Sequence, residues 1–414
     1  MAAREPLGMV TNVTSMKPLT YGRQSIDDDD VRAVEAQLRD DWLTQGPTVA
    51  RFEAALCEIT GARHAVAVSS GTAALHLACL ASGVRAGDVG ITSTLSFVAS
   101  ANGIRYCLGT PRLVDVDPET GLMSLSALEA AVDDLASKGI RPRVIIPVDF
   151  SGATADLAGV SRIAKRISAT VIEDAAHSLG ATYERDGRQH RAASCSEATM
   201  AILSFHPVKH LTTGEGGAIT TNDEGLYKEL LDLRSHGITR DPARLTRNDG
   251  PWYQEQQSLG FNYRITDLQC ALGVSQARRF PTFLDRRRAI ARLYDRAFAA
   301  PEWRERITPL RVPDGVTSAY HLYVVRLNAR PGESRDDVMA RRKAVFLALR
   351  ERGIYPQVHY VPIHAHPDFR AFVQGQEFPG AEAYYAGCLS LPMYPALTDA
   401  DVQRVIDVLG DVVT

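Results

Sequence analysis

The segment Ala65-Val-Ala-Val-Ser-Ser-Gly-Thr-Ala-Ala-Leu75 shows the local pattern on which the fold is built. Its apolar run Ala65–Val68 predicts a short buried strand, and the small residues after it predict a tight turn into a helix. Such a turn lets backbone N–H groups and a hydroxyl approach a phosphate at the helix N-terminus. Many strand-to-helix turns share this composition, so the segment alone does not establish a phosphate site.

Six further apolar runs follow, and amphipathic segments such as Ser124–Val132 and Ala158–Arg166 lie between them. The runs are Gly90–Thr92, Pro111–Val116, Val144–Phe150, Thr170–Glu173, Thr199–Phe205 and Gly217–Thr221. Strands that alternate with helices need crossover connections, and several of these runs lack the polar alternation of a half-exposed strand. The pattern therefore predicts an α/β fold with a mostly parallel seven-stranded sheet and helices on both faces.

The pattern changes near residue 280. A charged amphipathic helix is predicted at Thr282–Ala299, a strand at His321–Leu327, and helices at Arg341–Arg352 and Asp399–Leu409. Since 414 residues exceed what one hydrophobic core usually serves, we expect an N-terminal tail (1–20), a large domain (21–275) and a smaller C-terminal α+β domain (276–414). The acidic run Asp27–Asp30 is interpreted as a helix start and not as a metal site, because carboxylates stabilise the N-terminal end of a helix.

Composition excludes several classes of function. The chain is 45% hydrophobic and 23% charged, with a formal net charge of −3, which argues against nucleic acid or an anionic membrane as a partner. We find neither an apolar stretch long enough for a membrane helix nor an apolar run at the N-terminus that would make a signal peptide. Six scattered cysteines without a C-x-x-C pair indicate reduced thiols and a cytoplasmic protein.

Two charged residues follow predicted strands. Asp174 ends the string Val-Ile-Glu-Asp, and Lys209 lies between two strands in the string SFHPVKHLTTGEGG at 204–217. In open α/β sheets ligands bind at the carboxyl ends of the strands. An aspartate there is costly unless it meets a cation or donors, and a protonated pyridine nitrogen would be such a partner. A loop lysine is usually a solvated charge, but a lysine near that site can form an imine. We therefore predict pyridoxal phosphate as the cofactor.

The strings SFHPVKHLTTGEGG (204–217), EDAAH (173–177) and SSGTAAL (69–75) together resemble the DegT/StrS-type sugar aminotransferases, which are fold-type-I pyridoxal-phosphate transferases. The resemblance extends from about Tyr21 to Leu409 and includes WLTQGP (42–47) and LGFNYRITDLQ (259–269). HYVPIH (359–364) and RSHGITRDP (234–242) are most similar to the branch of the family that serves pseudaminic acid biosynthesis. That branch aminates C4 of a UDP-linked 4-keto-6-deoxy-N-acetyl hexosamine.

The resemblance implies roles in cofactor binding. Lys209 would hold the cofactor as a Schiff base and then move a proton between the α-carbon and the cofactor's C4′. Asp174 would pair with the pyridine nitrogen, His177 would lie near the ring hydroxyl, and Phe97 would stack on the ring. The phosphate would be held by Gly71, Thr72 and Ser204, and by Asn262 of the partner subunit.

The resemblance also implies how the substrates are bound. The candidate substrate contacts are Thr44, Arg264, His359 and His364. Arg264 would reach the sugar nucleotide diphosphate across a homodimer with shared active sites, and L-glutamate would be the amino donor. The spacing of His359, His364 and His366 could suggest zinc, but no cysteine or carboxylate accompanies them, so we predict no metal.

Two alternatives remain open. One is a different pyridoxal-phosphate reaction, such as sugar dehydration or amination of a cyclitol, although the family's dehydratases have histidine where this chain has Lys209. The other is a non-catalytic regulator that binds the cofactor. The presence of Lys209, Asp174 and the phosphate turn in one chain argues against a regulator.

Overall fold

The computed structural model describes residues 17–373 and 375–413. Its central sheet has seven strands: β2 (His64–Val68), β3 (Val89–Ser93), β4 (Thr110–Val114), β5 (Pro142–Ile146), β6 (Thr170–Asp174), β9 (Met200–Ser204) and β10 (Gly217–Thr221). Their order is β2-β10-β9-β6-β5-β3-β4, and only β10 runs antiparallel to its neighbours. The predicted α/β fold with a mostly parallel seven-stranded sheet is confirmed.

One predicted strand ends earlier than expected. The run Val144–Phe150 reads as a continuous strand, but β5 stops at Ile146. Pro147 follows it, and proline has no N–H to donate to a neighbouring strand. The regular strand therefore ends here, although Val148 still forms a single parallel bridge with Asp174 and lines the cavity described below.

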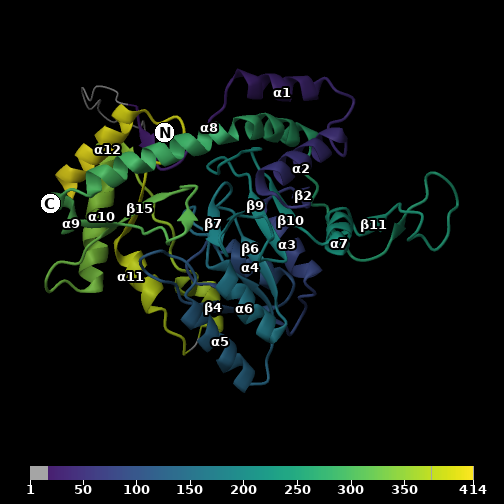
Figure 1. The fold of residues 1–414 in the computed structure, drawn as a ribbon, viewed down its shortest axis with the longest axis horizontal. Coiled ribbons are helices and arrows are strands. Elements are labelled where there is room, and N and C mark those ends of the chain that lie inside the picture. The colour runs from purple at the N-terminus through teal and green to yellow at the C-terminus, as the bar shows by residue number, and fades with distance from the viewer. Residues whose placement is uncertain (1–16, 374, 414) are drawn as a thin grey trace, which may run out of the picture.

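Helices cover both faces of the sheet (Figure 1). One face packs against α3 (Gly71–Ala81), α4 (Ala99–Tyr106) and α7 (Glu224–Arg234). The other packs against α2 (Pro47–Thr60), α5 (Leu125–Ser137), α6 (Leu157–Ile167) and the first half of α8 (Asp267–Phe298). Successive side chains of a strand point to opposite faces. In β2, accordingly, Val66 and Val68 lie in one core and Ala65 and Ala67 in the other.

Helix α8 is longer than the sequence pattern indicated. It starts at a capping box made by Thr266 and Gln269 and continues through Pro281 for 32 residues. In Figure 1 it crosses the upper part of the molecule, below α1. The predicted helix began after Pro281, because proline within a helix usually ends it. The expected domain boundary at 275/276 falls inside α8, and the division into domains stays a prediction.

The C-terminal region has its own core. Ile290, Tyr294 and Phe298 of α8 pack there with Leu19, whose side chain is fully buried. Leu19–Thr20 form β1, which pairs in parallel with β16 (Ile354–Tyr355), whereas residues 1–16 of the expected tail lie outside the described residues. The other elements of this region are α9 (Pro301–Arg304), β13 (Ile307–Pro309), β15 (Tyr323–Leu327), α10 (Arg335–Glu351), two short 3₁₀ helices (Ile363–Ala365 and Pro367–Phe372), α11 (Pro379–Gly387), β17 (Cys388–Leu391) and α12 (Asp399–Val412).

Two small sheets were not anticipated from the sequence. In one, β7 (Thr182–Arg185) pairs with β8 (Arg188–Arg191) and with β14 (Val316–Thr317). In the other, β11 (Ile238–Thr239) pairs with β12 (Glu255–Gln256) at the base of an arm that projects from the large region in Figure 1. Strands this short carry too little apolar periodicity to be detected in a sequence.

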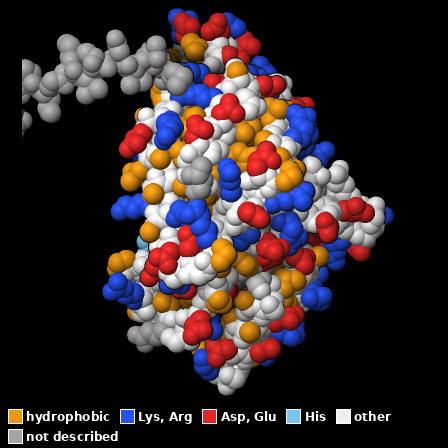
Figure 2. Space-filling model, turned by 90° about the vertical axis from the view of Figure 1, so that its left-hand side faces the viewer, with side chains coloured by type: hydrophobic (Ala, Val, Ile, Leu, Met, Phe, Trp, Pro, Cys, Tyr) orange, Lys and Arg blue, Asp and Glu red, His pale blue; other side chains and the backbone are white. Residues whose placement is uncertain are grey.

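The surface mixes charges of both signs. Figure 2 shows the end of the molecule that carries α10 and α12, where basic and acidic side chains are interspersed. This agrees with the small net charge of the whole chain. Among the described residues, no helix is both long enough and apolar enough to cross a bilayer.

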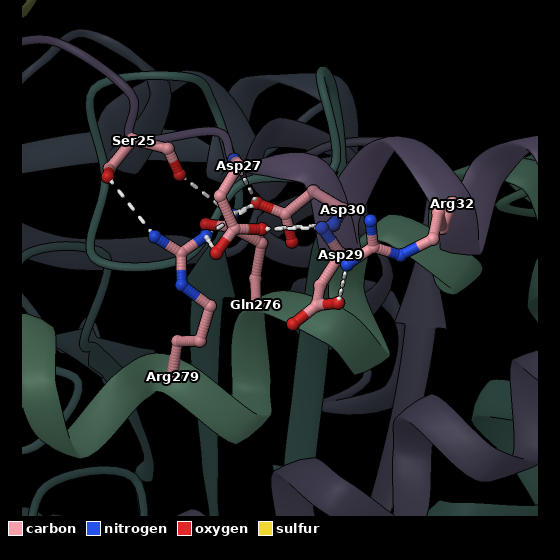
Figure 3. A network of polar contacts seen from close by, with 7 residues as sticks. All are labelled: Ser25, Asp27, Asp29, Asp30, Arg32, Gln276 and Arg279. Carbon is pink, nitrogen blue, oxygen red and sulfur yellow. Dashed lines mark hydrogen bonds and ion pairs between the residues drawn. The ribbon is translucent and has the colours of Figure 1, made fainter.

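The acidic run near the N-terminus opens helix α1 (Asp28–Leu38), as predicted. Asp27 is the N-cap, and it forms a capping box with Asp30. Asp30 is only 1% exposed and also joins α1 to α8, because its Oδ2 accepts hydrogen bonds from Gln276 (2.6 Å) and Arg279 (2.8 Å). Figure 3 shows these side chains converging between the two helices, while Asp29 points away to Arg32.

Replacing Asp30 with alanine should destabilise the protein. The substitution removes a buried acceptor that Arg279 and Gln276 share, although Arg279 keeps its ion pair with Asp27 and Gln276 its bond to the Ser25 carbonyl. We expect a loss of about 1–3 kcal/mol in the free energy of unfolding. Urea denaturation measures this loss. Asp29→Ala is the matched control, since its ion pair with Arg32 is exposed and should contribute little. Equal effects of the two substitutions would contradict the importance of the buried contact.

Candidate active site

A cavity of about 400 Å³ lies at the carboxyl ends of β6 and β9, between the sheet and the C-terminal region. Eight of the site residues predicted from the sequence line it: Gly71, Thr72, Phe97, Asp174, His177, Ser204, Lys209 and His359. They come from five separate segments of the chain. The structure therefore brings together most of the residues that the sequence motifs singled out.

The phosphate turn is held in place by close backbone packing. Ser70 caps α3 by accepting a hydrogen bond from the N–H of Ala73. A Cβ atom on Gly217 would lie 2.5 Å from the carbonyl carbon and oxygen of Ser70, so only glycine lets β10 pass the turn. Gly71 is similarly close to Ser204, since a Cβ atom on this glycine would lie 3.0 Å from the serine Cβ. The first N–H groups of α3 lack intrahelical acceptors, and they stand at the positive end of the helix dipole.

Asp174 is the last residue of β6 and is 5% exposed. Its Oδ2 accepts a hydrogen bond from the Ser100 hydroxyl (2.6 Å), and its Oδ1 accepts one from the N–H of Ala176 (3.3 Å). Burial raises the pKa of this carboxyl group, and the two donors act in the opposite direction. Within the described residues no cation lies within ion-pair distance of Asp174, so a cationic group in the cavity would stabilise its charged form.

Lys209 lies in the loop between β9 and β10, where its N–H donates to the carbonyl of His206 (2.8 Å). Burial lowers the pKa of its amine to about 7; Asp174 opposes this shift, and the buried guanidinium of Arg287 adds to it. A lysine with this pKa is substantially neutral near neutral pH. Its amine can therefore act as a nucleophile or accept a proton.

Four buried histidines surround Lys209: His177, His210, His321 and His359. His177 Nε2 lies 3.1 Å from the Tyr360 hydroxyl, and His359 Nδ1 lies 2.8 Å from the Ser390 hydroxyl. Burial lowers the pKa of all four, that of His359 to about 3. All four rings are therefore neutral near neutral pH.

Several residues of the cavity were not predicted from the sequence. They include Tyr21, Ser100, His321 and Tyr360. None of them belongs to the phosphate turn, the strand-end aspartate or the lysine loop. They reach the cavity from other parts of the chain. Tyr360 lies in the string HYVPIH (359–364), but no local pattern assigned a role to it or to the other three residues.

Four predicted residues do not line this cavity: Thr44, Asn262, Arg264 and His364. Thr44 pairs with Thr266, and Asn262 with Ser235, through single β-bridges. Arg264 forms such a bridge with Val68, next to the phosphate turn. His364 contacts the Thr94 hydroxyl (2.7 Å) and stacks on Phe378. Their roles as cofactor or substrate contacts stay predictions.

The model of the DegT/DnrJ/EryC1/StrS aminotransferase family matches residues 24–410. The chain belongs to this family. Its relatives include the spore coat polysaccharide biosynthesis protein SpsC of Bacillus subtilis. SpsC is 36% identical over 398 residues, which cover 95% of this chain and 97% of that protein.

Solved structures agree with this assignment. PseC of Helicobacter pylori, an aminotransferase involved in the biosynthesis of pseudoaminic acid, is 29% identical, with a TM-score of 0.83 over 96% of this chain and 99% of that one. Spr1654 of Streptococcus pneumoniae, in its PLP form, is 28% identical, with a TM-score of 0.83 over 96% and 98% of the two chains. The protein is therefore a pyridoxal-phosphate-dependent sugar aminotransferase, and the predicted enzyme class and cofactor are confirmed.

The residues of the cavity fit pyridoxal phosphate. The N-terminus of α3 offers N–H groups for a phosphate, and Asp174 has room for a cationic partner. His177 Nδ1 is buried and has no hydrogen-bond partner among the described residues, so it is available to a ring hydroxyl. Together these groups match the phosphate, the ring nitrogen and the ring hydroxyl of the cofactor.

The rate at which the cofactor-free protein takes up pyridoxal phosphate should depend on the charge of Lys209. Only the neutral amine attacks an aldehyde, so the rate should rise with pH through a midpoint of about 7 and then level off. Stopped-flow absorbance over a pH series measures this midpoint. Asp174→Asn should move it to lower pH, because Asp174 stabilises the ammonium form. A midpoint at the ordinary lysine value would contradict the assignment.

Proposed function

We propose that the enzyme transfers an amino group from L-glutamate to C4 of a UDP-linked 4-keto-6-deoxy-N-acetyl hexosamine. The observation that carries the proposal is a lysine of lowered pKa beside a strand-end aspartate and a phosphate turn in one cavity. Similarity to PseC, which is named for pseudoaminic acid biosynthesis, supports the sugar. The name of SpsC, which refers to polysaccharide biosynthesis, supports a role in making a surface sugar.

The residues of the cavity would hold the cofactor at three points. The N-terminus of α3, with Gly71 and Thr72, would bind the phosphate together with Ser204. Asp174 would pair with the pyridine nitrogen, and His177 would contact the ring hydroxyl. When bound, pyridoxal phosphate supplies a conjugated ring that withdraws electrons from the carbon bearing the transferred nitrogen. Phe97, which is 59% exposed at this cavity, would cover a face of that ring.

Lys209 would move the protons of the reaction. Its neutral amine would take the proton from the α-carbon of the amino donor and, in the second half of the cycle, deliver a proton to C4 of the sugar. A pKa of about 7 suits both tasks, because neither protonation state is strongly favoured near neutral pH. His359 lines the same cavity and would contact the sugar.

A homodimer with shared active sites would complete the site. The described residues that line the cavity include one lysine and no arginine. A sugar nucleotide carries two phosphates and the donor carries two carboxylates, so these substrates need further cationic groups. Arg264 lies beside the phosphate turn and Asn262 pairs with Ser235, and neither residue lines the cavity of its own chain. We infer that they serve the site of the partner subunit, with Thr44 and His364 as additional substrate contacts.

The substrate proposal is tested with purified holoenzyme, L-glutamate and a panel of 4-keto sugar nucleotides. We expect formation of 2-oxoglutarate and an amino sugar with UDP-linked substrates, measured by mass spectrometry. Lys209→Ala should lose the visible absorption band of the bound cofactor and all turnover. Turnover of dTDP- or GDP-linked sugars but of no UDP-linked sugar would overturn the proposed substrate. It would leave the reaction class intact.

The shared site is tested by mixing two inactive variants. Lys209→Ala lacks the reactive amine, whereas Arg264→Ala lacks the proposed contact to the partner's substrate. In a mixed dimer one of the two sites has neither defect, so an equal mixture should recover about a quarter of the wild-type activity after subunit exchange. Each variant incubated alone is the control. No recovery in mixtures shown to contain mixed dimers would contradict shared sites.

A further inference from the structure

His321 lies in the wall of the active-site cavity, although no sequence motif marks it. It precedes β15 in the C-terminal region, whereas His177 follows β6 in the sheet. The two rings lie 4.3 Å apart between centroids and are tilted by 43°. His321 is 3% exposed, and its ring also lies 5.6 Å from that of His210. The contact therefore joins the C-terminal region to the large region directly beside Lys209.

The backbone that carries His321 is held tightly. Ala319 donates to the carbonyl of Gly152 (2.8 Å), and Leu322 donates to that of Ser151 (3.2 Å). A Cβ atom on Gly152 would lie 2.7 Å from the N–H nitrogen of His321, and Gly152 has a φ of 111°, so this approach requires glycine. These contacts fix the position of the His321 imidazole relative to the segment that follows β5.

Arg287 of α8 holds the same segment from the other side. Its guanidinium is 1% exposed and donates to the carbonyls of Tyr320 (3.2 Å), His321 (3.2 Å) and Met393 (3.0 Å). Burying a guanidinium is costly, and here backbone carbonyls offset that cost. A fully buried cation committed to this short segment indicates that the position of the segment matters.

The neighbours of His177 keep it neutral. The titratable and charged groups that face it are His321, Lys209, His210, His359, Tyr360 and Asp174. Burial lowers the pKa of His177 well below its usual value, and the positive charge of Lys209 acts in the same direction. Tyr360 occupies Nε2, which leaves Nδ1 for the bound cofactor. A half-turn of the ring about its Cβ–Cγ bond would put carbon atoms in the places of both nitrogens, so both contacts would be lost.

We propose that His321 is a positioning residue of the active site, and that its ring packs on His177 to exclude water and to hold the imidazole in one orientation. This function needs a flat ring of the right size at position 321. It does not need the nitrogens of His321, and Nδ1 of His321 indeed has no hydrogen-bond partner among the described residues. The inference rests on the aminotransferase chemistry of the site and not on the identity of the sugar.

The proposal predicts that His321→Ala and His321→Phe differ. Alanine admits water beside His177, so the His177 pKa should rise towards its ordinary value, and the ring should take up its proton at a higher pH than in the wild type. Phenylalanine keeps the flat ring and excludes water, so the His177 signal should follow the pH profile of the wild type. NMR of the histidine Cε1–H signals in the holoenzyme measures this, with His177→Asn to assign the signal. This readout requires no substrate.

The rate of the half-reaction should also differ between the alanine and phenylalanine variants. His321→Ala should lower the rate constant of the half-reaction with the amino donor by about tenfold to a hundredfold, with little change in KM, because a misplaced contact affects the reacting geometry. His321→Phe should restore most of that loss. His76→Ala is the matched control, since His76 is also buried but contacts Tyr263 outside the cavity. It should leave the His177 signal unchanged.

Three results would overturn the proposal. The first is a His177 signal that stays unchanged with pH in His321→Ala. The second is a His321→Phe variant in which His177 titrates, and the half-reaction slows, as much as in His321→Ala. The third is a normal half-reaction rate in His321→Ala despite titration of His177. Failure of L-glutamate as donor would instead refute the proposed function, because the NMR result does not depend on the donor.

Discussion

Burial of charge at one cavity is the constraint on which the site depends. Lys209 and Asp174 line the cavity, and the protein packed around them disfavours the charged form of each. The two shifts have opposite chemical consequences: the lysine becomes a nucleophile at neutral pH, and the aspartate gains most from a cationic partner. Arg287, which is buried nearby, strengthens the first effect. A cofactor with a protonated ring nitrogen and an aldehyde matches both groups.

The fold creates this environment because several of its elements converge at one edge of the sheet. The carboxyl ends of β6 and β9 and the N-terminus of α3 reach the same edge of the sheet because most of the strands are parallel. Strand β10, the one antiparallel member, returns past the phosphate turn only because Gly217 has no side chain. Helix α8 then carries the chain to the C-terminal region, whose residues close the cavity opposite the sheet.

Local sequence signals identified the parts of the site that lie on continuous motifs. The phosphate turn and Lys209 each follow a mostly apolar strand, and Asp174 ends another strand, so their positions at the sheet edge could be predicted. The strand predicted at Val144–Phe150 was too long, because β5 ends before Pro147. Helix α8 was expected to start after Pro281, but its capping box at Thr266 and its packing on α1 and α2 carry it through the proline. Tertiary packing outweighs local preference at such places.

The sequence by itself determined the α/β class, the family and the cofactor, because these depend on periodicity and on short motifs whose residues are neighbours in the chain. The tertiary structure alone decided which other groups surround Lys209. His321 and His177 meet only because Arg287 and the Ser151–Gly152 backbone fix the segment before β15. The lowered pKa of Lys209 was likewise decided by folding, because desolvation depends on every group packed around an amine and not on its neighbours in sequence.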